Sequence, residues 1–160
     1  RVAKMFVQEL FEGLDEKNEP KITVFNGDKE HGMVFLGGIR VYSTCAHHFL
    51  PFPTKIHIAY LPDKKIVGLS KLARIAKYFA RRPQVQEQLT DQIANFIMNK
   101  LKPKGVAVLI EGEHLCMSMR GVENEGAVMK TTIFKEEFSK YDKTIYKFCL
   151  HSEIFLGCAM

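Results

Sequence analysis

The segment at residues 45–48, Cys-Ala-His-His, concentrates the side chains best suited to chemistry in this 160-residue chain. Cysteine sulfur and imidazole nitrogen are ligands that Zn²⁺ accepts, so one thiolate and two imidazoles this close together can supply part of a metal site. A buried cysteine beside surface histidines explains the segment equally well when it is considered alone. The segment therefore indicates a metal site only if a distant part of the chain supplies a further ligand.

Residues 114–120, with the sequence HLCMSMR, contain such a ligand. If 115–120 forms a strand whose pleat extends one residue back, one face of that strand is polar and the other is an apolar core layer. The polar face would carry His114, Cys116, Ser118 and Arg120. Cys45, one histidine of 45–48 and Cys116 would then make three protein ligands and leave the fourth tetrahedral position for water. That arrangement is typical of a catalytic zinc site.

Residues 68–74, GLSKLAR, open a predicted helix and form a candidate phosphate site. A helix N-terminus offers unpaired N–H groups and the positive end of the helix dipole, and Lys71 and Arg74 lie three residues apart on one face. The alternative is a solvated basic face on an amphipathic helix. The same spacing recurs at Arg1 and Lys4 on the first predicted helix.

Gln86 and Glu87 fall in the first turn of a long predicted helix. A carboxylate is favourable there because it faces the positive end of the helix dipole, and this explains Glu87 without any function. Glu87 could alternatively accept hydrogen bonds from a base with adjacent N–H donors. The spacing alone leaves both interpretations open.

The elements expected to position these residues come as runs of strands and a separate run of helices. This order favours an α+β fold with antiparallel pairing over alternating βαβ units. The apolar patterns predict helices at 2–12, at 70–79 with Ser70 as N-cap, and at 84–101. Strands are expected at 22–25, 33–36, 39–44 after a Gly37-Gly38 turn, 54–61, 65–68 after a hairpin turn at 62–64, 106–110, 115–120 and 128–134, with a helix and a tail over the last 25 or so residues.

Length and charge set broader limits on the chain. Its 160 residues correspond to one domain, 1–160, and its 23 basic against 18 acidic residues give a net charge of +5. That charge suits a small polyanionic substrate as well as an ordinary solvated surface. The absence of an apolar run of about 20 residues and the charged N-terminus predict a soluble, cytoplasmic protein. Because the first residue is Arg1, upstream sequence is expected to be missing.

With these elements in place, the chain resembles the GTP cyclohydrolase I family over about four fifths of its length. The resemblance rests on RVAKM at 1–5, PKIT at 20–23, CAHH at 45–48, the long segment 68–94 and EHLCMSMRG at 113–121, in the family's order and with its intervals. The pattern fades beyond Phe138. Cys149 and Cys158 have no role in the family and are expected to serve packing or to lie in the tail.

The resemblance implies a tunnelling fold (T-fold), in which antiparallel strands carry two helices on one side. It also implies toroidal pentamers that stack as a decamer, with sites between subunits, so that a monomer is inactive. By motif, Cys45, His48 and Cys116 would hold zinc, and His47 and His114 would be the acid/base histidines. The residues implied to recognise guanine are Glu87 and Gln86, and those implied to bind the triphosphate are Ser70, Lys71, Arg74, Arg120, Arg1 and Lys4.

The implied reaction opens the guanine imidazole ring of GTP, releases C8 as formate and yields 7,8-dihydroneopterin triphosphate, the first step of pterin and folate-type biosynthesis. The chain departs from the family at Ala46, where a glutamate is usual, and this bears on metal affinity or rate more than on substrate class. Two alternatives remain open on the sequence. One is a T-fold enzyme acting on another pterin or deazaguanine, and the other is a non-catalytic subunit that binds a purine nucleotide or a partner.

Overall fold

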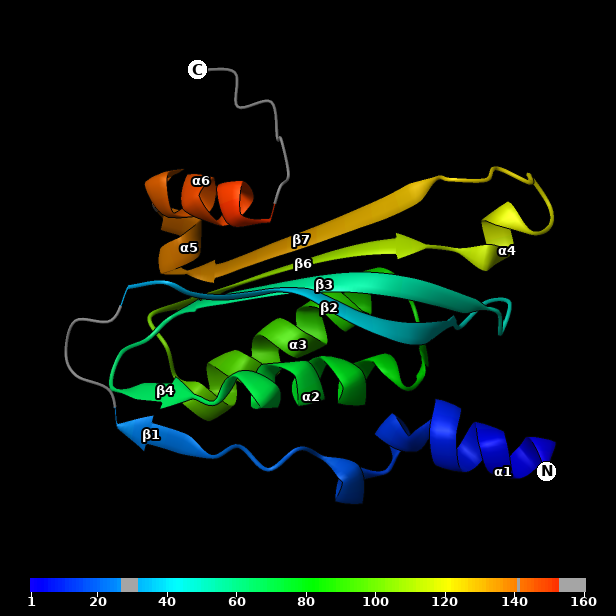
Figure 1. The fold of residues 1–160 in the computed structure, drawn as a ribbon, viewed down its shortest axis with the longest axis horizontal. Coiled ribbons are helices and arrows are strands. Elements are labelled where there is room, and N and C mark those ends of the chain that lie inside the picture. The colour runs from blue at the N-terminus through cyan, green and yellow to red at the C-terminus, as the bar shows by residue number, and fades with distance from the viewer. Residues whose placement is uncertain (27–31, 141, 153–160) are drawn as a thin grey trace.

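The computed structural model describes residues 1–26, 32–140 and 142–152, and a five-stranded sheet organises them (Figure 1). Its strands lie in the order β5-β2-β3-β6-β7. The long neighbours pair antiparallel, and only the short β5 runs parallel to β2. The bounds are β2 Val34–Cys45, β3 Pro51–Leu61, β5 Pro83–Gln84, β6 Gly105–Glu113 and β7 Val128–Glu136. The predicted α+β class with antiparallel pairing is confirmed.

The predicted turn at Gly37-Gly38 is wrong, because β2 runs through it as one strand. Residues on both sides of the glycines pair with β3, and the register shifts between Leu36 and Ile39. Gly38 has a φ of +74°, which an L side chain rarely adopts. The two glycines therefore form a β-bulge, which bends the strand and does not reverse it.

The hairpin predicted at 62–64 is also wrong. β4, Lys65–Val67, pairs with β1, Val24–Asn26, in a separate two-stranded sheet. The neighbour of β3 is instead β6, in a register that joins Tyr60 to Val106. The strand expected at 22–25 is thus present as β1, shifted toward the C-terminus.

Two helices cover one face of the five-stranded sheet (Figure 1). α2 spans Leu69–Ala80 and α3 spans Gln86–Leu101. Gly68 occupies the N-cap position of α2 that was predicted for Ser70, and α3 begins two residues later than predicted because Pro83 and Gln84 form β5. The apolar stripe of α2 is as expected, since Leu72, Ile75 and Ala76 are buried.

The core between the sheet and these helices is built from alternate residues of the strands. Ile56, Ile58 and Tyr60 of β3 pack there with Leu72 of α2 and Ile93 of α3. Each large apolar side chain that is fully buried contributes about 1.5–3 kcal/mol. This layer fixes α3 against β6 and so determines where the first turn of α3 lies.

The C-terminal helices lie on the opposite side of the sheet (Figure 1). α5 spans Glu137–Lys140 and α6 spans Asp142–His151. Phe138 and Phe148 are buried there against Ala59, Ala107 and Leu109. Cys149 is buried on α6, in keeping with its expected packing role, and Cys158 lies outside the described residues. Within the ranges described, we find no helix with the length and apolarity to cross a membrane.

The N-terminal helix predicted at 2–12 is present but changes its winding. α1, Val2–Met5, continues into a π-helical turn, η1 at Phe6–Leu10, and two short 3₁₀ turns follow, η2 at Glu12–Leu14 and η3 at Glu16–Asn18. Arg81 at the end of α2 binds this segment through a 2.7 Å ion pair with Glu12 and a 2.8 Å hydrogen bond to the carbonyl of Glu9. These contacts hold the N-terminal segment beside the end of α2.

The strand predicted at 115–120 is wrong. Residues Leu115–Ser118 form a short helix, α4, and the polypeptide turns at His114. The His114 carbonyl accepts hydrogen bonds from the N–H groups of Met117 at 2.8 Å and Ser118 at 3.1 Å. The expected alternation of a polar and an apolar face is therefore absent from this segment.

Candidate metal centre and substrate site

The first metal-ligating segment forms the loop between β2 and β3. Cys45 ends β2, and the chain reverses over residues 46–50 before β3 begins. Two hydrogen bonds of 2.9 Å close the loop, from the Phe49 N–H to the Cys45 carbonyl and from the Cys45 N–H to the Leu50 carbonyl. Phe49 takes a φ of +55° to make this turn. The reversal places His48 back beside Cys45.

Cys45, His48 and Cys116 form one group. The Cys45 sulfur lies 3.6 Å from His48 Nδ1 and 3.9 Å from the Cys116 sulfur, and the three ligand atoms lie within 4.8 Å of one another. A tetrahedral zinc with Zn–S bonds of about 2.3 Å and Zn–N of about 2.0–2.1 Å requires separations of roughly 3.8 Å between sulfurs and roughly 3.6 Å between sulfur and nitrogen. A disulfide would need about 2.05 Å between the sulfurs, and both cysteines are free. The spacing thus fits a shared divalent cation.

The electrostatics of Cys116 follow from its burial and from the nearby Cys45 sulfur. Burial raises the pKa of the Cys116 thiol, the adjacent Cys45 sulfur raises it further, and Arg120 acts in the opposite direction. Two sulfurs this close resist ionisation together because their negative charges repel. A divalent cation reverses that balance, since it stabilises both thiolates.

His114 lies beside this group in a closely defined environment. Its ring stacks on Phe52 with centroids 4.4 Å apart and planes 9° apart. Its Nε2 lies 3.0 Å from Oε1 of Gln86. Burial lowers the pKa of the His114 imidazole, and the negative charge of Glu87 partly offsets this. His114, Gln86 and Glu87 therefore lie close together in the structure.

The two remaining residues predicted near the metal are exposed. His47 lies on the β2–β3 loop, with its ring centroid 6.1 Å from that of His48 and nearly perpendicular to it. Arg120 follows α4 and is close enough to Cys116 for its charge to lower the pKa of that thiol. Both side chains face solvent at the metal end of the subunit.

The phosphate candidates on α2 lie elsewhere. α2 begins beside β4, whereas α4 and the end of β2 lie at the opposite end of the sheet (Figure 1). One subunit thus keeps Ser70, Lys71 and Arg74 apart from the metal group. Arg1 and Lys4 are exposed at the N-terminal segment, on the helix side of the sheet.

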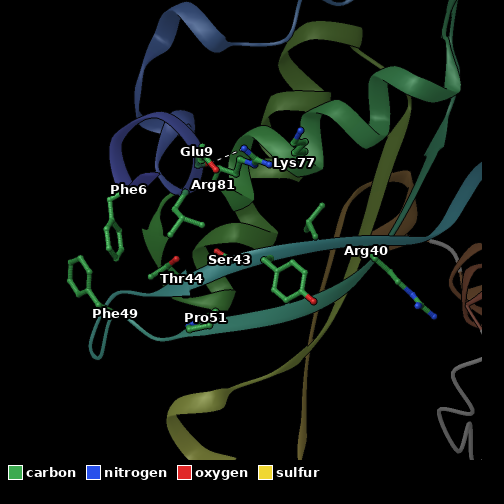
Figure 2. Close-up of a pocket in the computed structure, with 12 residues that line it drawn as sticks. Phe6, Glu9, Arg40, Ser43, Thr44, Phe49, Pro51, Lys77 and Arg81 are labelled. Atoms are coloured by element: carbon green, nitrogen blue, oxygen red, sulfur yellow. Dashed lines mark hydrogen bonds between the residues drawn. The ribbon is translucent and has the colours of Figure 1, made fainter. Parts of the chain in front are cut away.

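A cavity of about 470 Å³ lies between the N-terminal segment, β2 and the end of α2 (Figure 2). Phe6 and Phe49 lie at one end and Arg40 at the other, and Glu9 and Arg81 border it on the helix side. The described residues that line this cavity include neither His114 nor any of the three metal-ligating residues. The metal group is therefore not at the base of this cavity.

Two supporting residues were not identified from the sequence. Phe52 forms the stacking surface for His114, and Thr131 on β7 contacts the Gln86 amide. The apolar alternation of β3 could have placed Phe52 on the core face. Nothing in the local sequence links Thr131 to Gln86, 45 positions earlier, because α3 and β7 meet only in the folded protein.

The fold and the metal group together define a T-fold protein with a two-cysteine, one-histidine centre. The archaeosine synthase QueF-Like in its apo form has the same fold, with a TM-score of 0.56 at 14% identity over 67% of this chain and 96% of that chain. The family model described as GTP cyclohydrolase I matches residues 1–152. The chain belongs to the GTP cyclohydrolase I family.

Individual relatives agree with this assignment. GTP cyclohydrolase 1 from Aquifex aeolicus is 51% identical over 92% of this chain and 78% of its own length. GTP cyclohydrolase 1 from Bartonella henselae is 50% identical over 88% of this chain and 68% of its own length, and the protein of that name from Pelotomaculum thermopropionicum is 48% identical over 88% and 74%. The family match extends to residue 152, beyond Phe138, where the resemblance noted from the sequence fades.

Proposed function

We propose that this chain is a zinc-dependent GTP cyclohydrolase I, which hydrolyses GTP to 7,8-dihydroneopterin triphosphate and formate. The observation that carries the proposal is the meeting of Cys45, His48 and Cys116 within 4.8 Å in a chain about half identical to GTP cyclohydrolases. Cys116 lies far from Cys45 and His48 in the sequence, so their meeting depends on the fold and supports a shared chemical role.

Cys45, His48 and Cys116 would hold the zinc ion. Two thiolates and one imidazole form a donor set that zinc accepts, and three protein ligands leave room for a fourth. Bound there, zinc would supply Lewis acidity and a means of activating water near neutral pH. The half-buried Cys116 and the exposed His48 would keep one side of the ion open to substrate.

His114 and His47 would transfer protons during ring opening. His114 is half-buried, which lowers its pKa, and the stacked Phe52 restricts the ring to one plane. At near-neutral pH, a positioned imidazole can both accept a proton and return it to a leaving nitrogen. His47, which is exposed on the loop, would act on the solvent side of the same centre.

Glu87 would bind guanine at the start of α3, whereas the buried Gln86 would act through His114 and not by contacting the base. The exposed carboxylate of Glu87 can accept two hydrogen bonds from the adjacent N–H donors of the base, and its charge already acts on His114. Such a contact would place C8 near the metal group and convert binding energy into orientation. Ser70, Lys71, Arg74, Arg120, Arg1 and Lys4 would bind the triphosphate.

A complete site would require more than one subunit. Ser70, Lys71 and Arg74 lie at the opposite end of the molecule from α4, so a second copy could bring its own α2 to the metal group. Both sheet edges are suited to such an assembly. In the described residues β2 is paired along its outer edge only at Thr44 and Cys45, and β7 has no outer partner. We infer a ring of single-domain subunits, stacked as a decamer of two pentamers, in the cytoplasm.

Formate release tests this function. Purified protein supplied with GTP should release formate and yield a product that fluoresces after oxidation, whereas Cys116→Ser and His114→Ala should not. Cys149→Ala is the matched control, because this cysteine lies on α6, at the end of the sheet opposite α4, and its loss should preserve formate release. If wild-type protein binds GTP and metal but releases no formate, the non-catalytic alternative replaces this proposal.

A further inference from the structure

The Gln86 side chain is buried and fully engaged in hydrogen bonds within its own subunit. It is 1% exposed. Its Nε2 lies 3.0 Å from the Ile110 carbonyl, 3.0 Å from the Met129 carbonyl and 3.1 Å from Thr131 Oγ1, and its Oε1 lies 3.0 Å from His114 Nε2. One amide thus links α3 to β6, β7 and the imidazole beside the metal group.

The partners settle which end of the amide is the donor. The Ile110 and Met129 carbonyls can only accept, so the atom that faces them must be the NH₂ group. Thr90 donates its hydroxyl proton to the backbone carbonyl of Gln86 at 2.8 Å. The Thr131 hydroxyl, 2.7 Å from Thr90 Oγ1, must then donate to Thr90. Its oxygen and the two carbonyls are three acceptors that share the two hydrogens of the Gln86 NH₂ group.

The opposite end of the same amide is therefore an acceptor. Gln86 Oε1 has no proton to give, so His114 Nε2 must carry the hydrogen in their 3.0 Å contact. A neutral imidazole has one N–H, so the lone pair then resides on Nδ1. The acceptors on β6 and β7 thereby determine the tautomer of His114.

We propose that Gln86 is a positioning residue, which holds His114 as the Nε2–H tautomer and leaves Nδ1 as the nitrogen that exchanges protons during catalysis. The catalytic part of this inference rests on the proposed cyclohydrolase function. The tautomer itself rests only on the hydrogen bonds described above. Stacking on Phe52 fixes the plane of the ring, and Gln86 fixes its rotation within that plane.

This role differs from guanine recognition in what its loss changes. A side chain that only binds the base contributes to substrate affinity, so its removal raises KM. A side chain that only orients the proton-transfer group leaves GTP binding intact, and its removal lowers kcat. Loss of the hydrogen-bond partner of a metal-ligating histidine typically costs about 10–100-fold in metal affinity or activity, and we expect a loss of the same order in kcat for the partner of His114.

The first test is a nitrogen-15 solid-state NMR spectrum of histidine-labelled, metal-loaded protein without GTP. At about pH 8.5, well above the ordinary imidazole pKa of about 6.5, His114 should show a protonated Nε2 and an unprotonated Nδ1. The His114→Asn spectrum assigns the signals. A protonated Nδ1 in the wild-type protein would overturn the proposal, and this result needs no variant of Gln86.

The second test is the kinetics of Gln86→Met, which keeps the length of the side chain but removes the acceptor. We expect kcat to fall about 10–100-fold with KM for GTP within about threefold, and the NMR spectrum to show a mixture of tautomers. Gln88→Met is the matched control, because Gln88 is exposed on the same helical turn and should retain wild-type kinetics. A raised KM with unchanged kcat would contradict the positioning role and favour guanine binding.

Failure of the proposed function and failure of the positioning role of Gln86 give different results. If the wild-type protein releases no formate, the proposed function is wrong, whereas the tautomer measurement still reports on the Gln86 hydrogen bond. If the wild-type protein is active and Gln86→Met matches it in both kcat and tautomer, only the positioning role is wrong.

Discussion

Replacing Gly112 with alanine should disturb His114 mainly through Gln86, because the added Cβ would meet His114 Nε2 itself only at an ordinary contact distance of 3.6 Å. A Cβ at this position would lie 2.2 Å from Oε1 of Gln86, roughly 1.2 Å closer than the 3.4 Å at which ordinary contact begins. The amide cannot easily retreat, because its nitrogen is held by the Ile110 and Met129 carbonyls. Either β6 shifts or the amide leaves its acceptors.

The cost of either response can be estimated. Overpacking a filled site costs about 1–3 kcal/mol, and leaving a buried carbonyl without a partner costs about 1–3 kcal/mol. We therefore expect Gly112→Ala to lose about 1–3 kcal/mol of stability, which for a chain of this length corresponds to a fall of about 2–12 °C in Tm. The Gln86–His114 contact should weaken as well, so kcat should fall with little change in KM.

Thermal unfolding and steady-state kinetics at a fixed protomer concentration measure both effects, since assembly makes Tm depend on concentration. Gly32→Ala is the control, because a Cβ there meets nothing within 4 Å. Its stability should change by no more than about 0.5 kcal/mol. If Gly112→Ala matches Gly32→Ala in Tm and kcat, the tight packing of Gln86 against β6 is refuted.

Three further changes test other parts of the structure. Tyr60→Phe removes the hydroxyl that accepts the Val67 N–H at 3.1 Å, so it should cost about 1–3 kcal/mol in urea unfolding, and an unchanged midpoint would contradict that bond's role. Burial opposes the ionisation of Glu111, but Lys130, Lys55 and His57 outweigh it and lower the pKa of this carboxyl group. The ionised carboxylate therefore stabilises the fold at pH values above its pKa in the unfolded chain, and this contribution is lost as the pH falls through its pKa in the folded protein. Lys130→Ala removes the 2.8 Å ion pair with Glu111, so it should destabilise the protein at about pH 7 by up to about 1 kcal/mol and have less effect at about pH 3, and an equal loss at both pH values would argue against the ion pair. Lys71→Ala should raise the Kd for GTP about tenfold or more in calorimetric titrations while metal content stays constant, and unchanged affinity would remove Lys71 from the triphosphate site.

The sequence predicted the metal group for a reason that proved partly wrong. The expected strand at 115–120 rested on period-two alternation over six residues, which is too short to exclude a helix. Leu115 and Met117 are also good helix formers, and this signal favoured α4. Cys116 reaches Cys45 because the chain turns at His114 and not because a polar strand face carries it there.

Strand pairing was the least predictable feature of the fold. Pro62 and Asp63 are typical turn residues, yet β4 pairs with β1 and leaves β3 to the distant β6. This pairing is stabilised because it buries the continuous apolar run of β6 between two strands. The residues of a local turn give no information about that distant run. Helix faces depend on spacing within one segment, and accordingly the buried stripe of α2 was predicted correctly.

The hydrogen bonds of Gln86 could not be predicted for the same reason. Its acceptors lie 24 and 43 residues away, on two strands that meet only in the sheet. The resemblance to the family indicated that Gln86 belongs near the substrate, but the direction of its amide follows from carbonyls that no motif contains. Supporting hydrogen bonds of this kind can be identified only in the folded structure.

X-ray absorption at the zinc edge of the metal-loaded protein tests the central claim most directly. The account predicts two sulfur neighbours at about 2.3 Å, one nitrogen at about 2.0–2.1 Å and one further light atom, with one sulfur lost in Cys116→Ser. A shell of only nitrogen and oxygen, or a spectrum unchanged by Cys116→Ser, would contradict it.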